Sequence, residues 1–283
     1  MNDMLKAAQK QGFAIPAFNY SDIWEFLAIV ESAKQMNAPV YAASAMVTVG
    51  TLGLDYCAAL GRVGHQNHCG KLYNHLDHSN EVGLCKTAVD TGYHSVMLDA
   101  SRLPLEKNIA QTREVVLYAH RAGVLVEAEL GQILGRSDET AGWAEAEGER
   151  PTPESCVRLV RETGIDSLAI GIGNQHGFYH RDPELNIGLL RQVHKMIDIP
   201  LVLHGSTGLS EDDVRQCIAA GVCKVNVGTA IHHAYKTAVA GAILGEGRDS
   251  GIVELALLAK EAMKAVIMSW IRICGAEDKL EAV

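Results

Sequence analysis

The stretch LVLHGSTGLSEDDVRQCIAAGVCKVNVGT, residues 201–229, contains a strand, a helix and a second strand in succession. The apolar runs at 201–206 and 224–229 are typical of strands that are buried on both faces. Between them, Ser210 followed three residues later by Asp213 resembles a capping box, which predicts a helix over 210–221. A helical crossover between two buried strands indicates parallel strands, the repeating unit of an α/β fold.

The same alternation runs through the rest of the chain. Thr152 followed by Pro153 predicts the start of another helix, because proline is favoured in the first turn. Several expected helices end in a glycine just before the next apolar run, at Gly92, Gly123, Gly164 and Gly221. Eight strands are expected in all, at 15–19, 39–44, 71–77, 95–100, 125–130, 167–173, 201–206 and 224–229.

Eight parallel strands can close into a (β/α)8 TIM barrel, whereas an open doubly wound sheet is the alternative. Polar residues at the carboxyl ends of the expected strands favour the barrel, because these ends converge on one mouth. They are Asn19, Ser44, Asp77, Asp99, Glu129, His204 and Asn226. We therefore expect residues 1–283 to form a single α/β domain, a TIM barrel with a C-terminal helical extension.

Composition restricts the functional classes. The net charge of -9 leaves no basic stripe for a phosphate backbone, so we expect no nucleic-acid partner. The start resembles no signal peptide and no apolar run reaches the roughly 18 residues of a membrane span. We therefore expect no membrane partner and a cytoplasmic location. The 7 cysteines lack CxxC spacing, which argues against a disulfide framework or a cysteine zinc site, and we interpret them as buried thiols.

Two segments lie outside the alternation. Residues 131–150 form a long, Gly-rich, acidic connection, which is either a mobile lid or a disordered surface loop. We favour a lid because the connection leaves the expected mouth. Residues 230–283 are expected to be helical, and the apolar stripe of 255–275 is interpreted as core or subunit interface.

Three histidines lie just beyond expected strand ends: His78, His176 and His204. A catalytic zinc ion takes about three protein ligands and keeps an open position, and neutral imidazole is a favoured ligand. With 12 histidines in the chain, any single one is more often a surface or hydrogen-bonded residue. Their shared placement at one edge of the barrel favours a zinc site, whereas His75 is interpreted as a supporting or core residue.

Strand-end carboxylates accompany these histidines. Asp77 is the candidate acid–base group, because a carboxylate beside a metal and a reacting oxygen can relay a proton. Its alternative role is to orient a ligand. Asp99 and Glu129 are candidates either for a second cation or for bracing the histidines.

Two turns that are rich in small and hydroxyl residues follow the last two strands, HGSTG at 204–208 and NVGT at 226–229. Their backbone N–H groups can approach an anion, and barrels commonly bind phosphate at this place. Either turn alone could be an ordinary tight turn, but the pair on consecutive strands favours a phosphate site.

With NHLDH, a strand-end histidine followed by glycine, HGSTG and NVGT in this order, the chain resembles the class II fructose-bisphosphate and tagatose-bisphosphate aldolases. The resemblance covers nearly the whole length and extends to AIPAFN, SVMLDASRLPLEKNI and VEAELG. It implies a lyase that makes or breaks a carbon–carbon bond of a ketose phosphate, with dihydroxyacetone phosphate as the donor product.

The resemblance also implies roles for individual residues. His78, His176 and His204 would bind one catalytic Zn²⁺, and Asp77 would give a proton to the aldehyde-derived oxygen. Asp99 and Glu129 would lie near a secondary cation. The dihydroxyacetone phosphate portion would be bound by Gly177, Gly205, Ser206, Thr207, Asn226, Val227, Gly228 and Thr229.

The sequence departs from the family pattern at several places. The loop after the fifth strand lacks the usual acidic motif, so Glu139, or else Asp138, is the candidate for the base that removes the carbon-bound proton. His180, beside Arg181, replaces a lysine on the phosphate side. His232 stands where bisphosphate enzymes tend to have arginine or lysine, which favours an aldehyde partner that is unphosphorylated or otherwise unusual.

Two alternatives remain open at this point. One is a zinc-dependent hydrolase on the same barrel, against which the paired phosphate turns argue. The other is a non-catalytic subunit that binds sugar phosphates, for which the altered loop argues and against which Asp77 and the three histidines argue. For the aldolase, a small sugar phosphate is the expected partner, and a homodimer or homotetramer is the expected assembly.

Overall fold

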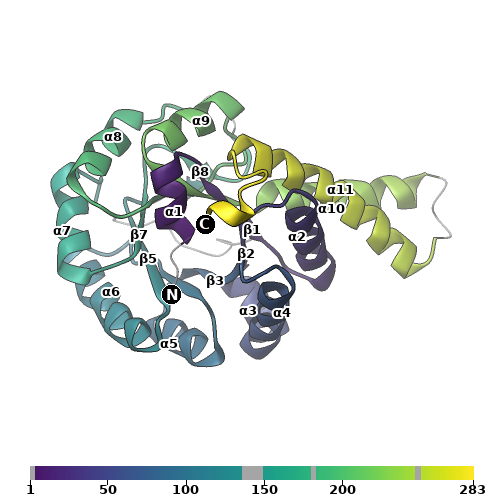
Figure 1. Ribbon diagram of the computed structural model, residues 1–283, viewed down its shortest axis with the longest axis horizontal. Helices are drawn as coiled ribbons and strands as arrows, with labels where there is room; N and C mark the ends of the chain where they lie inside the picture. The colour runs from purple at the N-terminus through teal and green to yellow at the C-terminus, as the bar shows by residue number, and fades with distance from the viewer. Residues whose placement is uncertain (1–3, 136–148, 180–182, 246–249) are drawn as a thin grey trace.

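The computed structural model describes residues 4–135, 149–179, 183–245 and 250–283. Its centre is a closed barrel of parallel strands in the order β1-β10-β9-β7-β5-β4-β3-β2 (Figure 1). The strands are β1 (Ile15–Asn19), β2 (Val40–Ala45), β3 (Leu72–Ser79), β4 (Ser95–Leu98), β5 (Leu125–Leu130), β7 (Ser167–Ile170), β9 (Leu201–Leu203) and β10 (Val222–Val227). All eight predicted strands are present, and the predicted TIM barrel is confirmed.

Helices surround the barrel and connect successive strands (Figure 1). They are α1 (Met4–Gln11), α2 (Ile23–Gln35), α3 (Met46–Leu52), α4 (Leu54–Asn67), α5 (Val82–Thr91), α6 (Leu105–Ala119), α7 (Pro153–Thr163), α8 (Ile187–Met196), α9 (Glu211–Ala219), α10 (Thr229–Leu244) and α11 (Ile252–Ile273), with short 3₁₀ turns η1 (His120–Ala122) and η3 (Leu280–Ala282). The main core lies between the barrel and this ring of helices, because nearly every barrel residue is buried.

The predicted helix signals occur where expected. Thr152 caps α7 by accepting a hydrogen bond from the Ser155 N–H, and Pro153 follows in the first turn. Ser210 caps α9 in the same way through the Asp213 N–H. Left-handed glycines end α5, η1 and α7, at Gly92, Gly123 and Gly164. Helix α9 ends earlier than predicted, because Ala219 is its last residue and Gly221 lies beyond the cap.

A second, two-stranded parallel sheet joins β6 (Leu134–Gly135) to β8 (Gln175–His176). No pattern in the sequence indicates this sheet, since strands of two residues are too short for a periodic signal. The sheet brings the connection after β5 next to His176. Residues 136–148 lie outside the described residues, so the lid remains a prediction.

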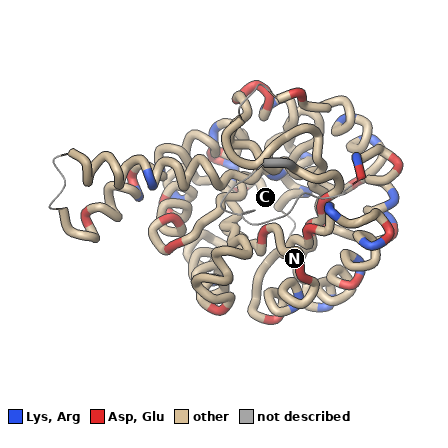
Figure 2. The backbone as a smooth tube through the Cα atoms, turned by 180° about the vertical axis from the view of Figure 1, so that it is seen from behind, with Lys and Arg blue, Asp and Glu red and all other residues tan. Residues whose placement is uncertain are grey.

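Helices α10 and α11 form a hairpin that projects from the barrel (Figure 1). Its base packs on α2, where Lys260 Nζ lies 2.6 Å from a Glu31 carboxylate oxygen. Its outer part exposes large apolar side chains: Ile243, Leu244, Ile252, Val253, Leu257 and Leu258. Among the described residues 243–245 and 250–258 of this part, only Glu254 is charged, and most of the coloured charged residues lie on the elements around the barrel (Figure 2).

No helix in the described parts of the chain is long and apolar enough to cross a membrane. The 7 cysteines are all free, and six are buried as expected. For Cys69 the prediction is wrong, because this residue is exposed in the turn before β3, where its φ is 51°.

Candidate active site

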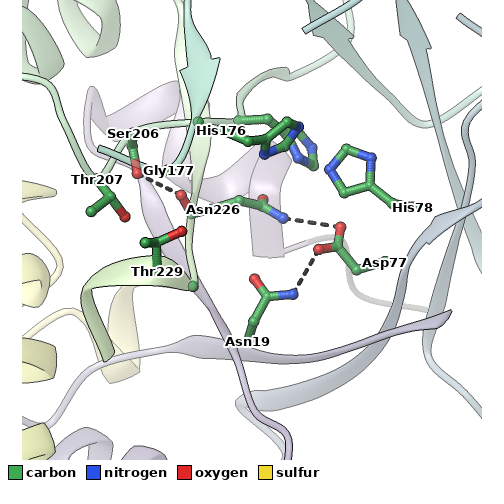
Figure 3. A pocket seen from close by; sticks show the side chains of 12 residues that line it. Asn19, Asp77, His78, His176, Gly177, Ser206, Thr207, Asn226 and Thr229 are labelled. Carbon is green, nitrogen blue, oxygen red and sulfur yellow. Dashed lines mark hydrogen bonds between the residues drawn. The ribbon is translucent and has the colours of Figure 1, made fainter. Parts of the chain in front are cut away.

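The carboxyl ends of the strands surround one pocket (Figure 3). It is lined by Asn19, Asp77, His78, His176, Gly177, His204, Gly205, Ser206, Thr207, Asn226, Gly228 and Thr229. These include all but one of the residues that were predicted to bind the dihydroxyacetone phosphate portion of the substrate. The exception is Val227, which does not line the pocket because its side chain is buried in the core.

An irregularity at the end of β3 places two neighbouring residues in the site. Successive strand residues normally point to opposite faces. Here the pairing of β3 with β4 shifts register between Leu76 and Ser79, and His78 has a φ of 49°. Positive φ in a non-glycine residue is uncommon and clusters at functional sites. As a result, Asp77 and His78 both line the pocket.

The three predicted histidines lie together. Their ring centroids are separated by 4.5 Å for His78 and His204, 4.9 Å for His78 and His176, and 6.4 Å for His176 and His204. Donor atoms of Asp77, His78 and His204 all lie within 4.8 Å of one another. His176 belongs to no such group among the described residues, so it stands slightly apart from the tight cluster.

Two of the rings are braced by carboxylates in the manner of metal ligands. Nδ1 of His78 lies 2.9 Å from Oδ2 of Asp99, which makes Nε2 the nitrogen available for ligation. Nε2 of His204 lies 2.8 Å from Oε1 of Glu127. The Nδ1 atom of His204 is buried and has no hydrogen-bond partner in the described part of the chain. A carboxylate on one ring nitrogen and an unsatisfied nitrogen on the other fit a divalent metal.

Charge at the site also favours a cation. Burial alone would lower the pKa of His78, but Asp77 and Asp99 outweigh it and raise the pKa to about 10. The carboxylates that attract a proton to this ring would attract a metal ion equally. Burial and the neighbouring His78 ring lower the pKa of His204, so that its ring stays neutral as ligation requires.

Asp77 is held as a carboxylate. Asn19 Nδ2 donates to Oδ2 at 2.8 Å, and Asn226 Nδ2 donates to Oδ1 at 3.1 Å (Figure 3). Burial would raise the pKa of Asp77, but the charge of the neighbouring His78 ring outweighs it and holds the pKa well below its usual value. Two amide donors therefore fix an ionised carboxylate beside the histidines, with the geometry of a proton acceptor.

Asp99 and Glu129 differ in environment. Asp99 accepts from His78 and, through Oδ1, from the N–H and hydroxyl of Ser101 at 3.1 and 2.7 Å. Burial and the Asp99 charge raise the pKa of Glu129 well above its usual value. Both carboxylates form a second group with His78 that could hold an ion. Asp99 thus braces the His78 ring, and the second-cation role stays a prediction.

A polar layer lies one step deeper in the barrel, two residues before Asp77, Glu129 and Asn226 on their strands. It consists of His75, Glu127 and Lys224, all almost fully buried. Sequence reasoning gave His75 a supporting or core role but missed the other two. A glutamate inside the buried run LVEAEL and a lysine inside KVNV could have signalled them, because buried charges require partners.

The two predicted phosphate turns adjoin each other. Ser206 Oγ donates to the Asn226 carbonyl at 2.5 Å, and the Ala230 N–H donates to Thr207 Oγ1 at 3.3 Å. Gly205 has a φ of +61°, and a Cβ there would lie 2.3 Å from the Gln175 carbonyl oxygen. Only glycine allows this approach. The second turn leads into the N-terminus of the 16-residue helix α10, which favours an anion.

Tyr179 ties the His176 segment to the first phosphate turn, a role that the sequence did not reveal. Its hydroxyl accepts from the Gln175 N–H at 2.7 Å and donates to the Gly205 carbonyl at 2.8 Å. The ring lies so close to Gly208 that a Cβ there would be 1.9 Å from Cδ2. This contact explains the glycine in the sequence HGSTG.

The remaining predicted residues are less closely connected. His232 is buried at the start of α10, and its Nδ1 lies 2.7 Å from Oε1 of Glu25. Glu139 and Asp138 lie outside the described residues, as do His180 and Arg181, so their predicted roles stay predictions.

Comparisons with known proteins agree with this architecture. A family model described as fructose-bisphosphate aldolase class-II matches residues 1–279. The crystal structure of the YdjI aldolase from Escherichia coli K12 has 27% sequence identity and a TM-score of 0.83, over 98% of this chain and 96% of that one. A protein from Coccidioides immitis, assigned as a fructose-1,6-biphosphate aldolase, has 28% identity and a TM-score of 0.89, over 99% and 97% of the two chains.

A third similar structure, the fructose-bisphosphate aldolase from Campylobacter jejuni, has 22% identity and a TM-score of 0.80, over 98% and 95% of the two chains. At this identity the likeness concerns the fold alone.

Proposed function

This chain belongs to the class II fructose-bisphosphate aldolase family and is an aldolase, a carbon–carbon lyase, and from that premise we propose a zinc-dependent enzyme that acts on a ketose phosphate. The proposed reaction is reversible aldol cleavage, with dihydroxyacetone phosphate as the donor product and all of residues 1–283 acting as one domain. The observation that carries the proposal is the meeting of Asp77 with His78, His176 and His204 in one pocket beside two phosphate turns.

In this proposal His78, His176 and His204 hold Zn²⁺ and leave one position open for substrate. When bound, the ion would supply Lewis-acid polarisation of the substrate carbonyl. The buried, unsatisfied Nδ1 of His204 supports its role as a ligand. His176 completes the set from the β8 segment, which the link between Tyr179 and Gly205 holds in place.

Asp77 moves the proton of the hydroxyl group beside the breaking bond. In the cleavage direction its carboxylate accepts this proton, and in the condensation direction the protonated acid returns it to the aldehyde-derived oxygen. Asn19 and Asn226 hold the carboxylate in one orientation throughout. The base that moves the carbon-bound proton is proposed to be Glu139, in the connection after β5.

The donor phosphate is proposed to lie between the two turns. Backbone N–H groups of Gly177, of Gly205 to Thr207 and of Asn226 to Thr229 are the candidate donors, and the N-terminus of α10 adds a favourable dipole. The structure supports this because both turns line the pocket that contains the histidines.

The aldehyde partner is proposed to be unphosphorylated. His232 stands where the family tends to have a permanent cation, and here its ring is paired with the buried carboxylate of Glu25. Asp22, Glu25 and Lys236 line the cavity beside it, so two carboxylates stand against one ammonium group. A phosphate placed there would meet this excess of like charge, whereas a neutral hydroxylated aldehyde would not.

For the assembly we propose a homodimer or homotetramer in which the apolar part of the α10–α11 hairpin contacts a second copy. Such a contiguous exposed apolar surface is uncommon on monomers. The chain also has an apolar groove between α2, α3 and α4, lined by Ile23, Leu52, Tyr56, Leu60 and Val63 among others. The apolar part of the α10–α11 hairpin on one copy could pack into the apolar groove between α2, α3 and α4 on another copy.

One experiment separates the aldolase from its alternatives. Zinc-loaded protein is incubated with dihydroxyacetone phosphate in D₂O, and exchange of the carbon-bound hydrogen is followed by NMR. The proposal expects exchange that a chelator abolishes and that Glu139→Gln strongly reduces. Zinc and phosphate binding without exchange would favour a non-catalytic subunit. Hydrolysis of substrates that lack a ketose phosphate would favour the hydrolase.

A further inference from the structure

Lys224 lies wholly inside the barrel. It belongs to β10, two residues before Asn226, and its side chain has 0% exposure. Burial of an ammonium group is costly unless it is paired and hydrogen-bonded. Nζ lies 2.8 Å from Oε2 of Glu127 and 3.2 Å from Nε2 of His75, and 5.6 Å from the centre of the Tyr41 ring.

The contact with Glu127 leads directly to a predicted metal ligand. Glu127 uses Oε2 for Lys224 and Oε1 for Nε2 of His204 at 2.8 Å. A carboxylate that is paired with an ammonium group can only accept hydrogen bonds. Nε2 of His204 must therefore carry the proton, and its Nδ1 presents a lone pair to the pocket. The tautomer of a ligating histidine is set in this way by its other nitrogen.

The contact with His75 leads to Asp77. An ammonium group has donors only, so Nε2 of His75 is the acceptor and Nδ1 carries the proton that goes to Ser95 Oγ at 2.9 Å. Nε2 of His75 also lies 3.6 Å from Oδ1 of Asp77. One buried lysine thereby fixes both the ring beneath Asp77 and the carboxylate beneath His204.

We propose that Lys224 is a positioning residue: through Glu127 it fixes His204 as the Nε2–H tautomer, so that Nδ1 faces the metal centre. The proposal rests on the proposed function only in taking His204 as a metal ligand. Its structural part, the tautomer, can be tested in the metal-free protein.

The test uses Lys224→Met and the double variant Lys224→Met/Glu127→Gln. The single variant leaves an unpaired buried carboxylate and is expected to be destabilised. The double variant removes both charges, and its glutamine can either donate or accept, so it no longer dictates the tautomer. Lys86→Met is the matched control, because Lys86 makes an ion pair of 2.6 Å with Glu114 at the surface.

Long-range ¹H–¹⁵N spectra of the metal-free proteins report the His204 tautomer. We expect Nε2–H alone in the wild type and in Lys86→Met, and a mixture with Nδ1–H in the double variant. Zinc affinity, measured by competition with a chelator, should be about 10- to 100-fold lower in the double variant than in the wild type. This loss should persist even if the double variant melts at a higher temperature than Lys224→Met. An unchanged tautomer in the double variant, or wild-type zinc affinity there, would overturn the proposal.

Failure of the proposed function gives a different result. In that case wild-type protein would show no exchange of dihydroxyacetone phosphate, while the tautomer difference between wild type and double variant would persist.

Discussion

Nδ1 of His78 and Oδ2 of Asp99 lie 2.9 Å apart, and both side chains are buried. The carboxylate orients the ring, so that the other nitrogen is available to a metal. Asp99→Ala should therefore reduce zinc affinity by about 10- to 100-fold, measured by chelator competition. Ser101→Ala removes only a donor to Asp99 and should have a smaller effect. Equal zinc affinity in Asp99→Ala and wild type would show that Asp99 does not brace the ligand.

Asp77→Asn should separate the two proton transfers. The variant keeps the shape of the side chain but cannot accept or return a proton at the hydroxyl oxygen. Cleavage of a ketose phosphate should fall by about 10²- to 10⁴-fold. Exchange of the carbon-bound hydrogen of dihydroxyacetone phosphate should persist, because a different base removes that proton. Loss of exchange together with cleavage, in protein that still binds zinc, would contradict this division of labour.

The fold could be predicted because the strands and helices follow local rules. Buried parallel strands are continuous apolar runs, and helix caps such as Thr152 and Ser210 depend on neighbouring residues only. The positions of Asp77, His78 and His204 in one pocket follow from the barrel, since strand ends converge.

Other features could not be predicted because they depend on contacts distant in sequence. Glu127 meets Lys224 across the barrel, 97 residues away, and Tyr179 meets Gly205 through a turn of no regular pattern. The short β6–β8 pairing has no periodic signal. Exposure of Cys69 depends on a turn geometry that its residue type, usually buried, does not indicate.

Tyr179→Phe should loosen the His176 segment without removing the ring that packs on Gly208. The variant loses the hydrogen bonds to Gln175 and Gly205. Its free energy of unfolding, measured by urea titration, should therefore be about 1–2 kcal/mol lower than that of the wild type. The KM for the ketose phosphate should rise more than kcat falls, since the turn is proposed to bind phosphate. Tyr118→Phe is the control, because its hydroxyl contacts Asp90 at the surface. Equal KM values for both variants would contradict the role of Tyr179.

Leu244→Lys should weaken assembly. This side chain is 87% exposed at the outer end of α10, so a lysine there leaves the core of the subunit intact. We expect a smaller mass by light scattering coupled to gel filtration. A cooperative thermal unfolding transition should show that the dissociated subunit is still folded. Leu117→Lys, at a 56% exposed position on α6, should leave the mass unchanged. Assembly that tolerates Leu244→Lys would place the subunit contact elsewhere.

His94→Asn should flatten the pH dependence of stability in mildly acidic solution. Burial and the stacked ring of His65 lower the pKa of His94 to about 4, whereas a histidine in the unfolded chain has a pKa of about 6.5. Between these values the unfolded chain binds a proton that the folded protein does not. The free energy of unfolding is therefore highest above the unfolded pKa and falls as the pH drops toward 4.

At pH 5 this loss amounts to about 2 kcal/mol relative to pH 7.5. Asparagine can keep an acceptor for the Asn74 N–H, which His94 Nδ1 now accepts at 3.1 Å, but it has no proton to bind in this range. Urea titrations of both proteins at pH 7.5, 6 and 5 measure the difference. Burial also lowers the pKa of His68, but that residue is present in both proteins and cancels. Parallel curves would mean that His94 is protonated as readily in the folded protein as in the unfolded chain.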